Sequence, residues 1–207
     1  MNERSFGIGA RVTLNVMSDD YVRIILNAIA TADASGLDVV TGDVSTFVSG
    51  AEVDIMRYLS QLISHAALSG AHVSATVQLS RGCPGEVVCD LPEGFGPWRS
   101  EIPVLETTGI QATAEWALYP LNDTVVKSVV PDHMRDIYAA IDLAKHSRTF
   151  VGSEHFVTRL QGDIADILHT MAAGWITVGR TLQHVTTHLT LSANSPTPAQ
   201  TGSGVVA

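Results

Sequence analysis

The 207-residue chain has little of what several functional classes require. Its two cysteines, Cys83 and Cys89, are too few for a four-cysteine zinc site or a disulfide scaffold. Lys and Arg total 12 against 21 Asp and Glu, so the net charge is −9. Such a chain lacks the clustered cations that bind nucleic acid phosphates or anionic lipid surfaces. We therefore expect no nucleic acid partner and no membrane insertion.

Long apolar runs are also missing, since no segment approaches the ~20 residues that span a bilayer. Residues 1–9 lack the basic start and apolar stretch of a signal peptide, which makes a cytoplasmic location the expectation. Hydrophobic residues nevertheless make up 45% of the chain. That share is enough for a sizeable core and excludes disorder over most of the length.

Motifs that announce catalysis are absent. The chain has no Gly-x-Ser-x-Gly, no His-Glu-x-x-His and no phosphate loop. His184 and His188 share one face of an expected strand, but their Cβ atoms then lie about 13 Å apart, too far for one metal. Cys83 stands in a Cys-Pro-Gly context that predicts a turn rather than a nucleophile. We therefore expect no catalytic residue, no metal and no cofactor.

What the sequence does contain is an internal duplication. Residues His72–Ser80 match His184–Ser192 at an offset of 112, with His, Val, Leu and Ser in common. Near the start of each half the offset is 104, which predicts an insertion of about eight residues near 124–131. Further matched pairs are Leu14 with Leu118, Thr46 with Thr158, Gly50 with Gly162, and Ile55 with Ile167.

Each half carries the same order of predicted elements: strand, helix, strand, strand, helix, strand. Alternating and β-branched segments predict strands, and apolar residues at helical spacing predict helices. In the first half the strands are expected over 11–17, 37–40, 44–48 and 72–80, and the helices over 21–32 and 53–67. In the second half the strands are expected over 111–119, 149–152, 155–160 and 184–192, and the helices over 131–146 and 163–178. This order is that of the ferredoxin-like βαββαβ unit.

The predicted architecture is therefore α+β, a tandem duplication with antiparallel four-stranded sheets and helices on one face. Repeat 1 is expected over 9–84, a Gly- and Pro-rich linker over 85–109, repeat 2 over 110–196, and a disordered tail over 197–207. The face of each sheet without helices is expected to be apolar and buried against the other repeat or another subunit.

Short polar side chains gather at the predicted strand ends and hairpin turns, where they can hydrogen-bond a heteroaromatic ring. From the residues alone, capping of turns explains them better than ligand binding does. The candidate ligand-binding residues are Asn15, Asp19, Ser45, Thr46, Ser80, Gly82 and Cys83 in repeat 1, and Tyr119, Asn122, His155, Thr158, Ser192 and Asn194 in repeat 2.

Several of these runs resemble the YkoF family of thiamine and hydroxymethylpyrimidine (HMP) binders. They are Val12-Thr-Leu-Asn-Val-Met-Ser-Asp-Asp20, Gly82-Cys-Pro-Gly85, Leu118-Tyr-Pro-Leu-Asn122 and Leu191-Ser-Ala-Asn-Ser-Pro196. The similarity runs from about Gly9 to Pro196. It implies two ACT-like, ferredoxin-like repeats, a homodimer, and one thiamine-sized site per repeat in which hydrogen bonds specify the pyrimidine. It further implies a role in thiamine or HMP salvage or transport.

The two repeats depart unequally from the family pattern. The family's aromatic–Pro pair is kept as Tyr119-Pro120, but repeat 1 has Asn15-Val16 there. The family's His is kept as His155, whereas repeat 1 has Asp43.

Two other functions use the same fold. An ACT-type regulatory module would bind an amino acid through groups for its α-carboxylate and α-amine, and this alternative stays open. An enzyme such as a cofactor-free oxygenase would need an enclosed acid–base constellation, which no spacing here announces.

Overall fold

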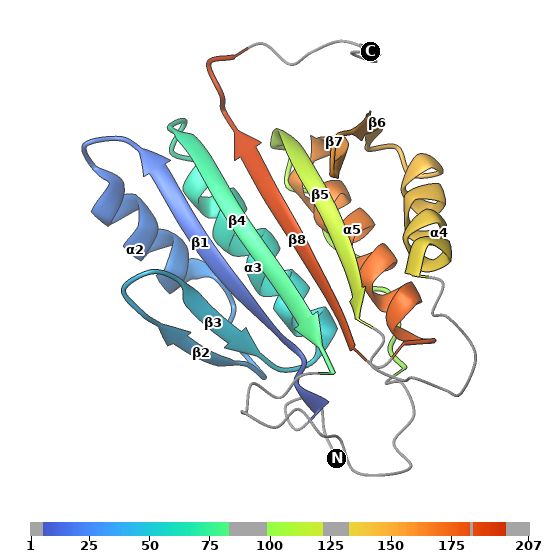
Figure 1. Cartoon of the computed structure of the whole chain (residues 1–207). Helices are drawn as coiled ribbons and strands as arrows, with labels where there is room; N and C mark the ends of the chain where they lie inside the picture. Colours follow the sequence, from blue (N-terminus) through green and yellow to red (C-terminus); the bar gives the residue numbers. More distant parts are fainter. Residues whose placement is uncertain (1–5, 83–98, 122–132, 183, 198–207) are drawn as a thin grey trace.

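The computed structural model describes residues 6–82, 99–121, 133–182 and 184–197. These form one eight-stranded sheet with the strand order β2-β3-β1-β4-β8-β5-β7-β6. All four described helices lie on the same face of this sheet, behind the strands in the view of Figure 1. The molecule is therefore a two-layer α+β structure with one sheet face left without helices.

The predicted βαββαβ order is confirmed in both halves. Repeat 1 consists of β1 (Gly9–Met17), α2 (Tyr21–Thr31), β2 (Asp38–Thr41), β3 (Thr46–Ser49), α3 (Glu52–Ala67) and β4 (His72–Arg81). Repeat 2 consists of β5 (Gln111–Leu121), α4 (His133–Lys145), β6 (Phe150–Glu154), β7 (Val157–Asp163), α5 (Ile164–Gly179) and β8 (His184–Ala193). Within each repeat the strands take the ferredoxin-like order, β4-β1-β3-β2 and β8-β5-β7-β6.

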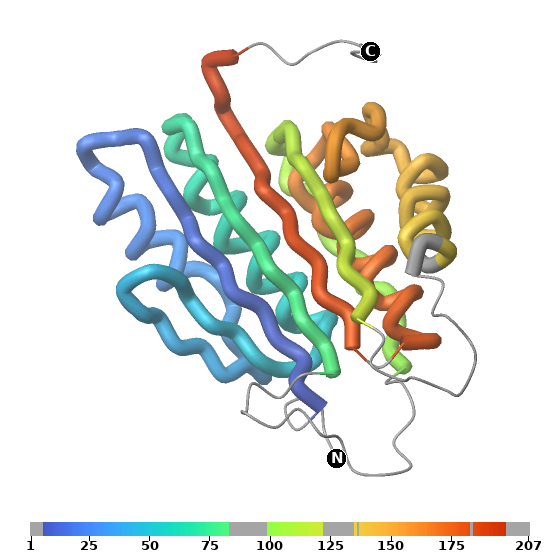
Figure 2. Tube along the Cα trace, in the orientation of Figure 1, coloured from blue at the N-terminus to red at the C-terminus, as the bar shows by residue number. Residues whose placement is uncertain are grey.

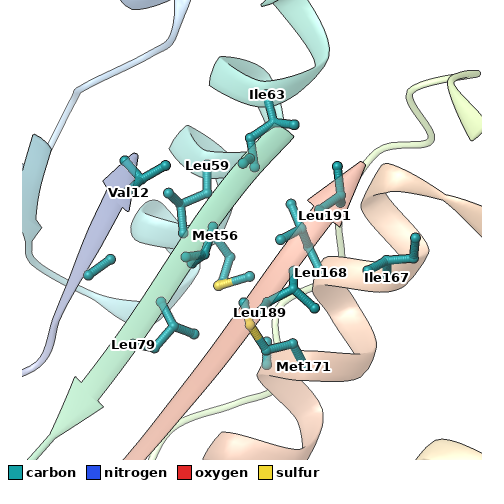
Figure 3. Close-up of a cluster of buried hydrophobic side chains, with 14 of the residues drawn as sticks. Val12, Met56, Leu59, Ile63, Leu79, Ile167, Leu168, Met171, Leu189 and Leu191 are labelled. Carbon is teal, nitrogen blue, oxygen red and sulfur yellow. The ribbon is translucent and has the colours of Figure 1, made fainter. Parts of the chain in front are cut away.

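The alternation in the strands decides which side chains meet the helices. In β4 and β8 the odd-numbered residues are buried under the helices, and the even-numbered ones face the open side. Residues of α3 and α5 pack onto this buried row, and Figure 3 shows Met56, Met171 and Leu189 from the two repeats in one cluster. A single hydrophobic core therefore spans both halves of the chain.

The two repeats join edge to edge through β4 and β8, whose traces run side by side in Figure 2. Val77 lies opposite Leu189, and these two residues are equivalent at the offset of 112. An approximate two-fold axis therefore passes through this pair and relates one repeat to the other.

The expectation of an apolar open face is wrong. The repeats bury strand edges against each other rather than sheet faces, so the open side stays polar on the central strands. The side chains that the central strands place on the open face are mainly small and carry hydroxyl groups, including Thr13, Ser74, Thr76, Thr186, Thr190 and Ser192.

The glycines shared by the repeats hold a conformation that other residues rarely adopt. Gly50 has φ +157° and Gly162 has φ +155°, each just after or within the last hairpin strand of its repeat. A Cβ atom at Gly50 would lie 2.9 Å from the backbone carbonyl oxygen of Gly36, so a side chain does not fit there without a shift of the backbone.

The predicted segments between and beyond the repeats lie partly outside the described residues. Residues 99–109, the described part of the linker, contain no helix or strand and are hydrogen-bonded to α5 and to the residue that follows it. There Arg180 Nη2 donates to the carbonyl oxygen of Ser100 at 2.8 Å, and His169 Nδ1 donates to that of Pro103 at 2.8 Å. The insertion near 124–131 and residues 198–207 of the tail lie outside the described ranges.

Candidate ligand-binding site

A cavity of about 260 Å³ lies in repeat 1 between β1, α2 and the turn that joins β2 to β3. Its walls are apolar and come from three elements, while the β2–β3 turn supplies a polar rim. The wall residues are Val12 and Leu14 of β1, Ile25 and Ile29 of α2, and Leu62 of α3. The volume is near the lower end of ligand pockets, roughly 300 Å³, and suits one ring system.

Local sequence explains how the walls form. Val12 and Leu14 occupy alternate positions of β1 and so point toward the helices. Ile25 and Ile29 are four residues apart in α2 and therefore share the helix face that covers β1.

Hydrogen bonds hold the β2–β3 turn against β1. The backbone N–H of Gly42 donates to the carbonyl oxygen of Ser45 at 3.0 Å, which extends the pairing of the hairpin beyond Thr41 and Thr46 and leaves a tight turn at residues 43–44. Strand β3 begins at Thr46 rather than at residue 44 as expected. Thr13 Oγ1 donates to the carbonyl oxygen of Val44 at 3.2 Å, and Arg11 Nη1 donates to Ser45 Oγ at 3.0 Å. The rim is thus fixed by side chains of the neighbouring strand.

The polar groups of the cavity are hydroxyls and one carboxylate. Thr46 is buried, and its Oγ1 lies 3.3 Å from Oγ1 of Thr41. Ser45 and Asp43 complete the lining on the same side. An apolar slot with hydroxyls and a carboxylate along one edge fits a flat heteroaromatic ring that carries an amino group or a positive charge.

The structure brings two of the predicted repeat 1 residues to this cavity, namely Ser45 and Thr46. Asn15 and Asp19 are exposed, on the open face of β1 and in the turn that follows it, and neither lines the cavity. Ser80 lies on the open face near Thr186, while buried Gly82 donates its N–H to the carbonyl oxygen of Phe6 at 3.2 Å. Cys83 lies outside the described residues.

The predicted residues of repeat 2 are spread over several surfaces. Thr158 is buried opposite Trp116 in the β5·β7 pairing. His155 is exposed in the β6–β7 turn, with its ring centroid 6.3 Å from that of Phe156. Tyr119 is half-exposed on the open face, and Asn122 lies outside the described residues.

Ser192 and Asn194 meet at a different hollow of about 600 Å³, near the end of β8. Ser192 Oγ lies 2.9 Å from His72 Nε2 across the junction of the repeats. Asn194 Nδ2 donates to the carbonyl oxygens of Ala67 and Ala71 at 2.7 and 3.0 Å. Both side chains therefore join the end of β8 to repeat 1.

The sequence prediction considered polar residues and did not identify the apolar wall of the repeat 1 cavity. Val12 and Leu62 line the cavity of repeat 1, and their counterparts in repeat 2 are Trp116 and Gly174. A direct comparison of the two halves at the offsets of 104 and 112 would have singled out both positions, because a wall residue changes size there.

Within the described ranges, no three His, Cys, Asp or Glu side chains gather as a metal site. Among the described helices, none has the length and apolar character needed to cross a bilayer.

Comparison with known proteins places these features in context. The sequence model of the YkoF-related family matches residues 7–86 and 111–198, which correspond to the two repeats. The chain is 31% identical over 188 residues to the putative HMP/thiamine-binding protein YkoF of Bacillus subtilis strain 168. That alignment covers 91% of this chain and 90% of the relative.

Proposed function

Because the chain belongs to the YkoF-related family, we propose that it binds thiamine or its hydroxymethylpyrimidine moiety without transforming it. The observation that carries the proposal is the half-polar cavity of repeat 1, which is of the size of one ring system. The putative binding role of the Bacillus relative supports it. In this role the protein serves thiamine or HMP salvage or transport.

The cavity suggests how the pyrimidine is held. The flat faces of the pyrimidine ring lie between Leu14 of β1 and Ile25 of α2, where they are shielded from water. The ring nitrogens and the amino group of the pyrimidine lie toward Thr46 and Asp43, which supply hydroxyl and carboxylate partners. The positive charge of thiamine also suits a chain whose net charge is −9.

The amino acid alternative has less support. Asp43 could accept from an α-amine, but no Lys or Arg stands among the described residues that line the cavity. An α-carboxylate would therefore enter without a cationic partner, which is costly in a partly buried site.

Calorimetric titration of the intact protein with thiamine, HMP and the isolated thiazole tests the proposal. We expect thiamine and HMP to bind and the thiazole to give no heat, because the cavity recognises the pyrimidine. Thr46→Val keeps the side-chain shape but removes the hydroxyl, and it should weaken binding about tenfold.

The matched control is Thr158→Val, which changes the equivalent residue of repeat 2. It should leave the affinity of the repeat 1 site unchanged. Absence of heat with both thiamine and HMP at high protein concentration would rule the function out.

A further inference from the structure

We propose that the repeat 1 cavity selects unphosphorylated ligands, cations above all, and discriminates against phosphate monoesters, with Asp43 as the residue that determines this specificity. The identity of the ligand rests on the function proposed above. The preference for positive charge rests on the charged groups around the cavity itself.

Asp43 supplies the charge of the cavity rim. Among the described residues that line the cavity, it alone carries a formal charge, and the others are apolar, glycine or hydroxyl-bearing. The side chain is exposed in the β2–β3 turn, and it takes part in no ion pair or hydrogen bond with another described residue. Its carboxylate is therefore available to a ligand at the rim.

The cations of repeat 1 are engaged elsewhere. The described part of this repeat contains four arginines and no lysine. Arg23 pairs with Asp20 at the start of α2. Arg57 Nη1 lies 2.6 Å from Asp54 Oδ1, and its Nε lies 3.2 Å from Asp33 Oδ2. Carboxylates therefore already neutralise both of these arginines.

The other two arginines are kept away from the cavity by burial and by the sheet. Arg81 is buried, and its Nη1 lies 3.6 Å from Oε1 of Glu52. Arg11 leaves β1 on the face without helices, where it donates to Ser45 and its guanidinium lies 5.6 Å from the centre of the Phe47 ring. The apolar walls of the cavity lie on the other face of β1.

A phosphate monoester would therefore meet a carboxylate and no cation. Phosphate carries roughly two negative charges at neutral pH, and proteins hold it with Arg, Lys or a helix N-terminus. The start of α2 already carries Asp19 and Asp20. Because the cavity of about 260 Å³ holds one ring, the phosphate would stay at the rim beside Asp43. A positively charged ligand is attracted by the same carboxylate.

This carboxylate is particular to repeat 1. At the offset of 112 the equivalent residue is His155 in the β6–β7 turn. The hydroxyl of Thr46, in contrast, is kept in repeat 2 as Thr158. The residue that sets the charge preference of repeat 1 is therefore one that the two repeats do not share.

NMR titrations of the full chain test the proposal at the methyl groups of Ile25 and Ile29, because both side chains line the cavity. Thiamine should bind about tenfold more tightly than thiamine monophosphate, and HMP about tenfold more tightly than its phosphate ester. Both ratios should fall when the salt concentration rises from about 50 to about 500 mM, because the rim is exposed. Equal affinities for phosphorylated and unphosphorylated ligands would overturn the proposal.

Asp43→Asn removes the charge and keeps the size of the side chain, so it should reduce both ratios to about threefold or less. The matched control is Asp166→Asn, which removes the same charge from an exposed position of α5 in repeat 2 and should leave both ratios unchanged. Ratios that stay near the wild-type values in Asp43→Asn would contradict the role given to this residue.

A second pair of probes is independent of the vitamin. Benzamidinium and benzoate are flat rings of similar size and opposite charge. Benzamidinium should shift the methyl signals of Ile25 and Ile29 at lower concentration than benzoate does, and Asp43→Asn should remove this preference. An equal response to the two probes in the wild-type protein would overturn the proposal.

The two sets of titrations separate this proposal from the proposed function. If the cavity prefers benzamidinium through Asp43 but neither thiamine nor HMP binds, the proposed function fails and the charge selectivity stands. If thiamine and its monophosphate bind equally well, the proposed function stands and the charge selectivity fails.

Discussion

Among single residues, Asp163 joins three segments of repeat 2. Its carboxylate accepts hydrogen bonds from the backbone N–H groups of Thr108, Gly109 and Ala165 at 3.0, 2.7 and 2.8 Å, and from Oγ1 of Thr108 at 2.9 Å. Burial of Asp163 favours the neutral acid, but these donors outweigh it and lower the pKa of the carboxyl below its usual value. The side chain thus caps α5 and attaches the start of β5 to it.

Asp163→Ala should lower the free energy of unfolding by about 1–2 kcal/mol at neutral pH. Because the pKa of Asp163 is lower in the folded state than in the unfolded state, its contribution is present above the unfolded pKa. It is lost as the pH falls through the folded pKa, so the difference from wild type should shrink in acid. Urea unfolding across this range measures it.

Asp166→Asn is the control, since this side chain is exposed in the first turn of α5. This change should alter the free energy of unfolding only slightly, both at neutral pH and in acid. A stability difference for Asp163→Ala that stays constant into strong acid would contradict the role given to the carboxylate.

At the level of single residues, the candidate site could be predicted from the sequence only in part. Ser45 and Thr46 were expected at a ligand site and line the cavity, whereas Asn194 was expected there and instead bonds to repeat 1. Short polar side chains at strand ends serve turns and ligands alike, so their sequence does not separate the two uses. Wall residues such as Leu62 follow the same helical period as core residues and are equally ambiguous.

Among the elements, β4 and β8 have the most protected place. Each is paired on both sides and lies at the centre of the sheet, while β2 and β6 form its edges. Strand β2 has four residues, and Val40 within it is 62% exposed.

Hydrogen exchange should therefore be slowest in β4 and β8 and fastest in β2 and β6 among the strands, because edge strands open without disturbing the core. Exchange followed by mass spectrometry on peptides of each strand measures the order. Protection of β2 equal to that of β8 would mean that another surface covers this edge.

The elements themselves were predictable because alternation and helical spacing act locally. The first and last residues of α3 and α5 also correspond at the offset of 112. The pairing of β4 with β8 was not predictable, since their sequences specify a buried face but not which strand edge meets which. The polar open face is the direct result of that pairing.

At the scale of the whole molecule, we propose that the open face forms a homodimer, as family membership suggests. Rows of small side chains cross it, such as Thr13, Thr76 and Thr190 in register on β1, β4 and β8. Small residues let two sheets approach to about 10 Å. No helix among the described residues covers this face.

Thr190→Lys places a charge on each copy of the face and should convert the dimer to monomer in sedimentation velocity experiments. Val104→Lys, at a 90% exposed position of the linker, should leave the dimer intact. A wild-type chain that sediments as a monomer at high concentration would refute the dimer.

The core that runs across the β4–β8 junction has a thermodynamic consequence. Because Met56 and Met171 belong to one packed cluster, neither repeat can melt while the other keeps its own interior, and the chain unfolds as one cooperative unit. Under the proposed function, a ligand bound in one repeat should therefore stabilise the other repeat as well, through linkage rather than contact.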